Sequence, residues 1–298
     1  MSNPAILSLG EVLWDLFPEG ARFGGAPANF ACHAAVLGAN VSMVSAVGDD
    51  SRGHEAIEIL RGHNVDVASI QVIEDAPTGS VGVSLDGAGK PTFVIHEDSA
   101  WDRIGWTPEL ESRGTAADAV YFGTLGQRGE VSRTTIRRAL DVAEASKTAR
   151  ILDVNLRPPY YDDVLIRESV GLASVLKLSD DELEEVAAAC GVGSAGDSQE
   201  RLRALLDQFN LDLVVMTRGA EGALLVSPDG TVDQPGVPTQ VRDTVGAGDA
   251  FTAVLVVGLL SGLALETVAR NACEHAAAVC ARLGAVPDLS ADFGAEDE

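Results

Sequence analysis

The sequence contains few cysteines, and none is spaced for a metal site or a redox motif. The four are Cys32, Cys190, Cys273 and Cys280. Without a CxxC pair or a Cys/His cluster, we expect buried thiols and a reducing compartment. No signal peptide is recognisable at the N-terminus, so we expect a cytoplasmic protein. The apolar run at 250–265 is too short to span a bilayer and is flanked by Asp249 and Glu266.

Lysine is also scarce, and the charge balance is strongly acidic. Only three of the 21 basic residues are lysines (Lys90, Lys147 and Lys177), and the formal net charge is −24. Such a charge argues against binding to nucleic acid or to an anionic membrane surface, because both require basic patches. A nucleotide site would have to rely on backbone amides, a metal ion and a few local cations. The composition fits adaptation to high salt and equally a GC-rich genome.

Several well-known catalytic motifs are missing. The chain has no GxxxxGK[ST] sequence, no HExxH and no set of residues suited to a Ser/His/Asp triad. A GxGxxG pattern at 191–196 follows a predicted helix instead of a strand, so we interpret it as a loop. Three tryptophans (Trp14, Trp101 and Trp106) could line a sugar site, but packing in the core or in a lid is the simpler expectation.

What is present is an alternation of apolar strands and helices. Strands are predicted at 5–9, 41–47, 119–125, 151–155, 174–178 and 213–217, with shorter ones at 223–226 and 231–234. Helices are predicted at 28–37, 52–63, 131–145, 162–171, 180–190, 201–209, 248–261 and 265–283. This alternation indicates an α/β fold with a mostly parallel central sheet flanked by helices on both faces.

One stretch departs from this pattern. Apolar residues alternate on both sides of a glycine-rich turn at 87–89, which predicts a hairpin over 78–98 with one apolar face. Residues 11–23, which include Pro18 and Gly20, are expected to be irregular. We assign the hairpin and parts of 11–24 to a small β-sheet lid on a single domain covering 1–298.

Polar residues gather directly after the predicted strands, where open α/β sheets bind their ligands. Glu11 and Asp15 follow the first strand. Further candidates follow later strands: Asp153, Asn155 and Arg157, then Lys177, then Arg218 and Gly219. Composition alone does not require this clustering.

The stretch at 242–264 combines a glycine turn with an apolar helix. Gly246 and Gly248 allow a tight turn that presents consecutive N–H groups at a helix N-terminus, which favours a bound anion. Asp249 lies in the first turn beside that position. Its carboxylate could simply stabilise its own helix, or it could accept a proton from a hydroxyl that attacks a bound phosphate.

DTVGAGDAF, which contains this turn, resembles the C-terminal signature of the ribokinase-like (PfkB) carbohydrate kinases. FGGAPANFACHAAVLG, at 23–38, resembles the N-terminal signature of that family. The two matches occur in the family's order, about 220 residues apart, and the resemblance extends over nearly the whole chain. It implies a ribokinase-like fold and transfer of phosphate from ATP to a sugar.

The resemblance also implies roles for individual residues in sugar binding. Those assigned to the sugar are Asp15, Gly24, Gly25, Asn29, Arg157 and Asp249. Asp15 could instead be a turn carboxylate, Asn29 a polar residue at a helix N-terminus, and Gly25 only a helix start.

For the reaction itself, Asp249 is assigned as the catalytic base and Gly246, Ala247 and Gly248 as the anion hole. Residues assigned to the nucleotide are Lys177, Thr217, Arg218, Gly219, Gly246, Gly248 and Asn271. Asn271 could equally be a solvated helix residue.

Two carboxylates are assigned to cations by the same resemblance. The family's N-x-x-E motif appears here with Ser179 in place of asparagine, which leaves Glu182 as a water-mediated Mg²⁺ contact. Asp243 matches a residue that can help to bind a monovalent cation such as K⁺, or it could cap the following turn.

Three stretches are more similar to fructokinases than to ribokinases: GEVLWDLFP, PTFVIHEDSAWD and DVNLRPPYY. They imply fructose as the substrate and fructose 6-phosphate as the product. Another hexose, a keto-sugar acid such as 2-keto-3-deoxygluconate, ribose and a nucleoside remain open alternatives. So does a sugar-binding regulatory paralogue without turnover. We expect a homodimer formed lid to lid.

Overall fold

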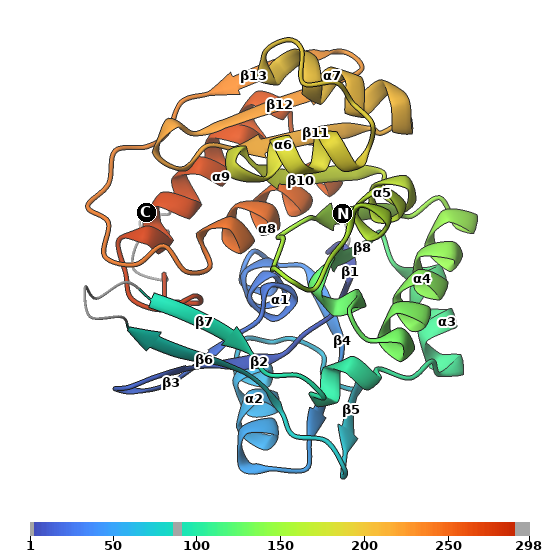
Figure 1. Ribbon diagram of the computed structural model, residues 1–298, viewed down its shortest axis with the longest axis vertical. Coiled ribbons are helices and arrows are strands. Elements are labelled where there is room, and N and C mark those ends of the chain that lie inside the picture. The colour runs from blue at the N-terminus through green and yellow to red at the C-terminus, as the bar shows by residue number, and fades with distance from the viewer. Residues whose placement is uncertain (1–2, 86–90, 290–298) are drawn as a thin grey trace.

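The large sheet is built mainly from parallel strands. The computed structural model describes residues 3–85 and 91–289, and in them nine strands form one sheet in the order β13-β12-β11-β10-β9-β8-β1-β4-β5 (Figure 1). These strands are β1 Ala5–Leu9, β4 Asn40–Gly48, β5 Ile70–Ile73, β8 Ala119–Gly123, β9 Ala149–Asp153, β10 Val175–Ser179, β11 Leu213–Thr217, β12 Ala223–Ser227 and β13 Gly230–Gln234. Pairing is parallel from β5 to β11, and β12 and β13 are added antiparallel. The predicted fold class is confirmed.

Helices cover both faces of this sheet. They are α1 Ala26–Val36, α2 Ser51–Gly62, α3 Pro108–Ala116, α4 Glu130–Ala145, α5 Asp163–Leu172, α6 Asp180–Ala189, α7 Ser198–Phe209, α8 Ala247–Leu260 and α9 Leu265–Cys280, with short 3₁₀ helices η1 Ala100–Arg103, η2 Leu125–Gln127 and η3 Gly219–Glu221. Strand side chains alternate between two buried layers. Leu7 and Leu9 pack with the α3–α7 layer, whereas Ile6 packs with α1, α2, α8 and α9. The central strands are therefore apolar on both sides, as a covered parallel sheet requires.

A second, four-stranded sheet lies apart from the first, in the order β3-β2-β6-β7 (Figure 1). Its strands are β2 Leu13–Phe17, β3 Gly20–Gly24, β6 Gly79–Leu85 and β7 Pro91–Ile95. The expectation of irregular backbone at 11–23 was wrong, because residues 18–19 form a two-residue connection between β2 and β3 and Phe17 pairs with Gly20. The hairpin of β6 and β7 is confirmed, and its predicted turn at 87–89 lies outside the described residues.

The sequence patterns also missed one strand of the large sheet and one α-helix. Strand β5 extends the edge of the large sheet beside β4. Helix α3 begins at Pro108, after Thr107 caps it by accepting a hydrogen bond from the amide of Leu110. A threonine cap followed by proline at the first helical position is itself a helix start signal.

The tryptophans and cysteines contribute to packing, as expected. Trp14 and Trp101 are buried, and Trp106 packs against the core beside α3 and α4. Cys32, Cys190 and Cys273 are buried free thiols, whereas Cys280 is only partly buried. Within the described residues, no helix is both long and apolar enough to cross a membrane.

The topology determines where a ligand binds. The chain leaves β1 towards β4 on one side and later returns to β8 on the other, so the strand order reverses at β1. Loops that leave neighbouring strands in opposite directions open a crevice at the carboxyl ends of those strands. The small sheet covers this crevice, because β2 starts just beyond the end of β1 and pairs with β6.

Candidate active site

The crevice contains a cavity of about 830 Å³ between the large sheet and the small one. Residues that line it from the large sheet and its helices are Glu11, Gly25, Ala26, Asn29, Leu125, Asn155, Leu156, Arg157, Pro158, Pro159, Tyr160, Lys177, Thr244, Val245, Gly246, Gly248 and Asp249. The small sheet contributes Leu13, Asp15, Phe17, Val81, Val94 and Ile95. Most of the predicted sugar and phosphate residues therefore meet in one place.

Two adjacent glycines shape one wall of the cavity. Gly25 precedes α1 with a positive φ of 107°, and a Cβ there would lie 2.6 Å from the carbonyl oxygen of Glu11. A Cβ on Gly24 would lie 3.0 Å from Oδ2 of Asp15. Gly24 does not line the cavity itself; its missing side chain leaves room for the Asp15 carboxylate.

Asn29 and Asp249, which are 220 residues apart, meet at the cavity floor. Nδ2 of Asn29 donates a hydrogen bond of 2.8 Å to Oδ2 of Asp249, and Oδ1 of Asn29 is buried without a partner in the described chain. Burial raises the pKa of Asp249, although the Asn29 hydrogen bond and the charges of Lys177 and Arg157 oppose that rise. The amide orients the carboxylate and leaves a polar oxygen for a ligand.

The glycine turn places Asp249 at an uncapped helix N-terminus. Helix α8 begins after Gly246, which has a φ of 80°, and no side chain caps it among the described residues. The first-turn amides therefore keep their hydrogen-bonding capacity for an anion. A Cβ on Gly246 would lie 2.4 Å from the carbonyl oxygen of Ala285. Nε2 of His33 lies 2.9 Å from the same carbonyl oxygen. This contact fixes the backbone of Ala285, against which Gly246 packs.

Lys177 is a buried cation next to this turn. Its Nζ lies 3.0 Å from Oδ1 of Asp153, whose Oδ2 accepts a hydrogen bond of 3.0 Å from Thr252 of α8. Burial alone would lower the pKa of Lys177, but Asp153 and Glu182 raise it overall. Burial also raises the pKa of Asp153 to about 6, against the opposing effect of Lys177. The ammonium therefore stays charged and lines the cavity beside Gly248.

Glu11 belongs to the site, although the family resemblance assigned it no role. Its side chain is buried just after β1, beside Gly126 of η2, and its Oε2 has no partner among the described residues. Burial raises the pKa of Glu11 to about 7, partly opposed by backbone hydrogen bonds and by Arg157. The signal available in the sequence was its place directly after the first strand.

Asp15 and Arg157 face the cavity from opposite sides. Asp15 lies on β2 of the small sheet, and Arg157 lies in the loop after β9. Burial raises the pKa of Asp15, while the charges of Arg157 and Arg22 lower it. Asn155 and Tyr160 of the same loop also line the cavity, and the resemblance did not single them out.

Seven further predicted site residues do not line the cavity: Ala247, Thr217, Arg218, Gly219, Asn271, Glu182 and Asp243. Glu182 caps α6, and its two carboxylate oxygens accept hydrogen bonds from the amides of Leu156 and Ser179 at 2.7 and 2.8 Å. The carboxylate of Asp243 accepts from the amides of Val245 and Gly284.

Ala247 begins α8, and the other residues of this group lie near β11 and α9. Thr217 ends β11, and Arg218 forms an ion pair with Asp233 and contacts backbone carbonyls around β12 and β13. Asn271 lies on α9. Their assigned roles in nucleotide and cation binding stay predictions.

Comparison with known proteins supports the two signatures. The family described as pfkB family carbohydrate kinase matches residues 19–292. The chain belongs to the pfkB family of carbohydrate kinases. The pfkB match includes both Gly25 in the cavity wall and the turn before Asp249.

Individual relatives are similar over nearly their full length. The chain is 29% identical to fructokinase-2 of Zea mays, over 99% of this chain and 94% of that protein. A sugar kinase of Pyrococcus horikoshii in complex with ATP is 31% identical, with a TM-score of 0.79 over 94% of this chain and 93% of that one. A Vibrio cholerae fructokinase with bound fructose, ADP and calcium is 24% identical, with a TM-score of 0.81 over 99% of both chains; at that identity the likeness shows the fold alone.

Proposed function

We propose that this pfkB chain is an ATP-dependent sugar kinase that phosphorylates a primary hydroxyl, with fructose as acceptor and fructose 6-phosphate as product. The observation that carries the proposal is the position of Asp249. Its carboxylate accepts a hydrogen bond from Asn29 of α1. It lies in the first turn of α8, which no side chain caps among the described residues, and near the buried Lys177. One side chain therefore reaches both a hydroxyl and a phosphate.

Asp249 would act as general base. It would accept the proton of the sugar hydroxyl while the new O–P bond forms and the bond between the γ-phosphorus and the departing ADP oxygen breaks. A raised pKa makes the carboxylate a better proton acceptor than an exposed aspartate. The amides at 246–249 and the Lys177 ammonium would stabilise charge on the transferring group, which contributes most in phosphoryl transfer.

We call the part of the cavity lined by Glu11, Asp15, Asn29 and Arg157 the sugar half. Its side chains favour a neutral polyol. Asp15, Asn29 and Asp249 offer several hydrogen-bond acceptors, and Glu11 adds a carboxyl group whose pKa is raised to about 7. Arg157 is the guanidinium lining this half. Its charge is the feature that would favour a keto-sugar acid instead, so 2-keto-3-deoxygluconate is the second candidate acceptor.

ATP binding is supported by the ATP complex of the Pyrococcus relative and by the amides and cation beside Gly246. We propose that residues 217–219 contact the nucleotide through their backbone, since the Arg218 side chain is held by Asp233. In the described chain no three metal-binding side chains gather into a cage. The oxygen donors present suit Mg²⁺ bound mainly by nucleotide phosphates and water, with Glu182 in an outer position.

Asp243 remains the residue proposed for K⁺, and the small sheet is proposed as a lid that excludes water when the sugar binds. We further propose that the chain is one kinase domain that works in the cytoplasm as a homodimer. Val94, a lid residue that is 56% exposed, is the kind of apolar contact such a dimer would cover.

The test is ADP release from ATP and Mg²⁺ with fructose, glucose, ribose, 2-keto-3-deoxygluconate and adenosine as acceptors, at low and high KCl. Turnover highest on fructose supports the proposal. A preference for 2-keto-3-deoxygluconate keeps the mechanism and replaces the substrate. Sugar binding without ADP release under any condition would instead identify a non-catalytic sugar-binding protein.

A further inference from the structure

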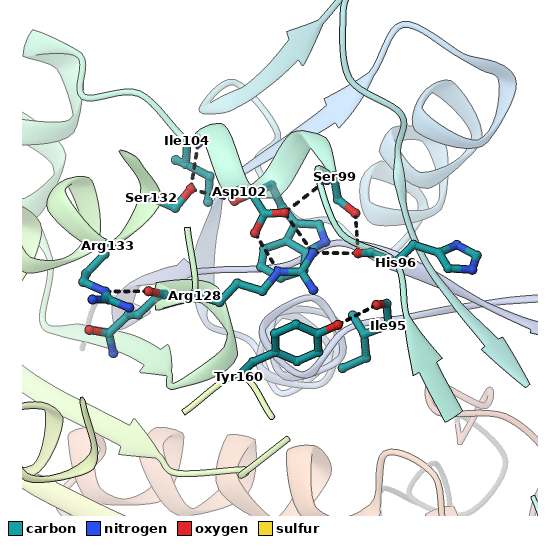
Figure 2. A network of polar contacts seen from close by, with 11 residues as sticks. Ile95, His96, Ser99, Asp102, Ile104, Arg128, Ser132, Arg133 and Tyr160 are labelled. Atoms are coloured by element: carbon teal, nitrogen blue, oxygen red, sulfur yellow. Dashed lines mark hydrogen bonds and ion pairs between the residues drawn. The ribbon is translucent and has the colours of Figure 1, made fainter. Parts of the chain in front are cut away.

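Arg128 is a buried cation outside the cavity, in the connection between η2 and α4. Its side chain is 7% exposed, and its guanidinium makes a paired contact with Asp102, from Nε to Oδ1 and from Nη2 to Oδ2, both at 2.8 Å (Figure 2). The guanidinium carbon lies 3.9 Å from the ring centroid of Trp101 and 4.8 Å from that of Tyr160. We call these four side chains the hinge cluster.

The hinge cluster is joined to the lid at two points. Nη2 of Arg128 donates a hydrogen bond of 2.7 Å to the carbonyl oxygen of His96, the residue directly after β7. The Trp101 ring packs against β6 so closely that a Cβ on Gly79 would lie 2.4 Å from its Nε1. Figure 2 shows Arg128 reaching from its own loop to the end of the lid strand.

The cluster is also joined to the cavity wall. The hydroxyl of Tyr160 donates a hydrogen bond of 2.8 Å to the carbonyl oxygen of Ile95, and both residues line the cavity. Tyr160 belongs to the loop that carries Arg157, to which its amide is hydrogen bonded. Leu125 of η2, three residues before Arg128, lines the cavity as well. Three segments that surround the sugar half thus converge on one guanidinium.

Arginine suits this position for physical reasons. A planar guanidinium can pair with a carboxylate through two parallel hydrogen bonds while both of its faces contact aromatic rings. A lysine ammonium cannot make all of these contacts at once. Nη1 has no hydrogen-bond partner among the described residues. The position of the guanidinium therefore depends on Asp102, on the carbonyl of His96 and on the two aromatic rings.

We propose that Arg128 is a positioning residue that fixes the angle at which β6 and β7 cover the sugar half of the cavity. Arg128 does not line the cavity itself and acts through Tyr160 and the carbonyl of His96. This inference rests on the proposed sugar kinase function, because its kinetic consequence is weaker binding of the acceptor. Its structural consequence, loosening of the lid base, does not depend on the substrate.

The experiment compares Arg128→Lys, Tyr160→Phe and the double variant with Arg133→Lys as the matched control. Arg133 lies near the start of α4 and donates to the carbonyl oxygen of Gln127, and within the described residues it makes no hydrogen bond or ion pair with the small sheet. Each variant is measured for KM of the sugar, KM of ATP and kcat. Hydrogen–deuterium exchange over residues 94–103 is measured without any ligand.

For Arg128→Lys we expect the sugar KM to rise about tenfold, with ATP KM nearly unchanged and faster exchange over 94–103. Tyr160→Phe, which removes one hydroxyl, should raise the sugar KM about threefold. The double variant should be no worse than about tenfold, since both changes release the same strand. Arg133→Lys should match the wild type.

A lower melting temperature of Arg128→Lys, with unchanged exchange over 94–103 and unchanged sugar KM, would overturn the proposal and leave Arg128 as a stabilising residue only. Independent, multiplicative effects of the two single variants would also contradict it. If the wild type turns over no acceptor, the proposed function fails. The exchange data then still decide whether Arg128 holds the base of the lid.

Discussion

The proposed sugar half of the crevice, around Asp15, Asn29 and Asp249, differs from the proposed nucleotide half, around Gly246 and residues 217–219. The difference lies in whether polar side chains point into the cavity or are held by other residues. In the sugar half, Asp15, Asn29 and Asp249 come from three distant segments and converge on one cavity. In the nucleotide half, the carboxylate of Asp233 holds Arg218, and Thr217 lies outside the cavity wall. In the proposed function, side chains would therefore orient the acceptor and hold the base, whereas the nucleotide would rely mainly on backbone amides and Lys177. An acidic chain can bind an anionic nucleotide in this way without a broad basic surface.

The largest expected effect comes from breaking the buried ion pair between Lys177 and Asp153. Lys177→Met leaves Asp153 buried without its cation, so the free energy of unfolding should fall by about 3–5 kcal/mol. Chemical denaturation at pH 7.5 measures it. Lys177→Met combined with Asp153→Asn should recover most of that loss but not the activity, because the charge beside Gly248 is still missing. Equal destabilisation by the single and double variants would contradict this account of the pair.

Glu11, in the sugar half, should make the stability of the protein depend on pH. Because its pKa is raised from 4.5 to about 7 in the fold, the native state binds more protons than the unfolded state between these values, and stability falls as pH rises through that window. Glu11→Gln removes this effect. Its stability relative to the wild type should therefore increase by about 3 kcal/mol between pH 4.5 and pH 8. If the free energies of unfolding of the two proteins changed with pH in parallel, the pKa of Glu11 would not be raised in the folded state.

A substitution at Gly246 tests the proposed anion hole at the N-terminus of α8. Gly246→Ala places a Cβ against the carbonyl of Ala285 and strains a positive φ, so the turn must shift and kcat should fall about 100-fold. Gly262→Ala is the matched control, since Gly262 also has a positive φ (71°) but nothing within 4 Å of the added Cβ. It should lose some stability and keep its kcat. Similar kcat losses in both variants would mean that backbone strain alone is responsible.

The smallest effect is expected at Arg218. Because its guanidinium already contacts Asp233 and backbone carbonyls, Arg218→Met should raise the KM of ATP by less than about fivefold. Steady-state kinetics with varied ATP measures this. A rise of tenfold or more at unchanged stability would show that the side chain leaves Asp233 to bind the nucleotide, and the contrast between the two halves would disappear.

Much of the fold and of the site could be predicted because both depend on local patterns. The apolar runs gave the central strands, and the two glycine signatures located the wall at Gly25 and the turn at Gly246. The strands at residues 13–24 were missed because Pro18 and Gly20 were interpreted as signs of irregular backbone, although Pro18 lies in a tight connection and Gly20 begins β3.

Other features depend on contacts between distant segments and could not be predicted. The raised pKa of Glu11 results from its burial, and the hinge cluster joins side chains from three segments: η1, the connection between η2 and α4, and the loop after β9. The carboxylates of Glu182 and Asp243 were assigned to cations by resemblance. Only the structure shows that backbone amides already occupy part of their hydrogen-bonding capacity.

The most direct test of the central claim is the turnover of Asp249→Asn with the preferred acceptor. Asparagine keeps the shape of the side chain and its contact with Asn29 but cannot accept the proton. We predict a loss of kcat of about 10³-fold or more, with the dissociation constant of the sugar, measured by calorimetry, changed less than about threefold. A variant that keeps kcat within tenfold of the wild type, while binding sugar normally, would contradict the assignment of Asp249 as the base.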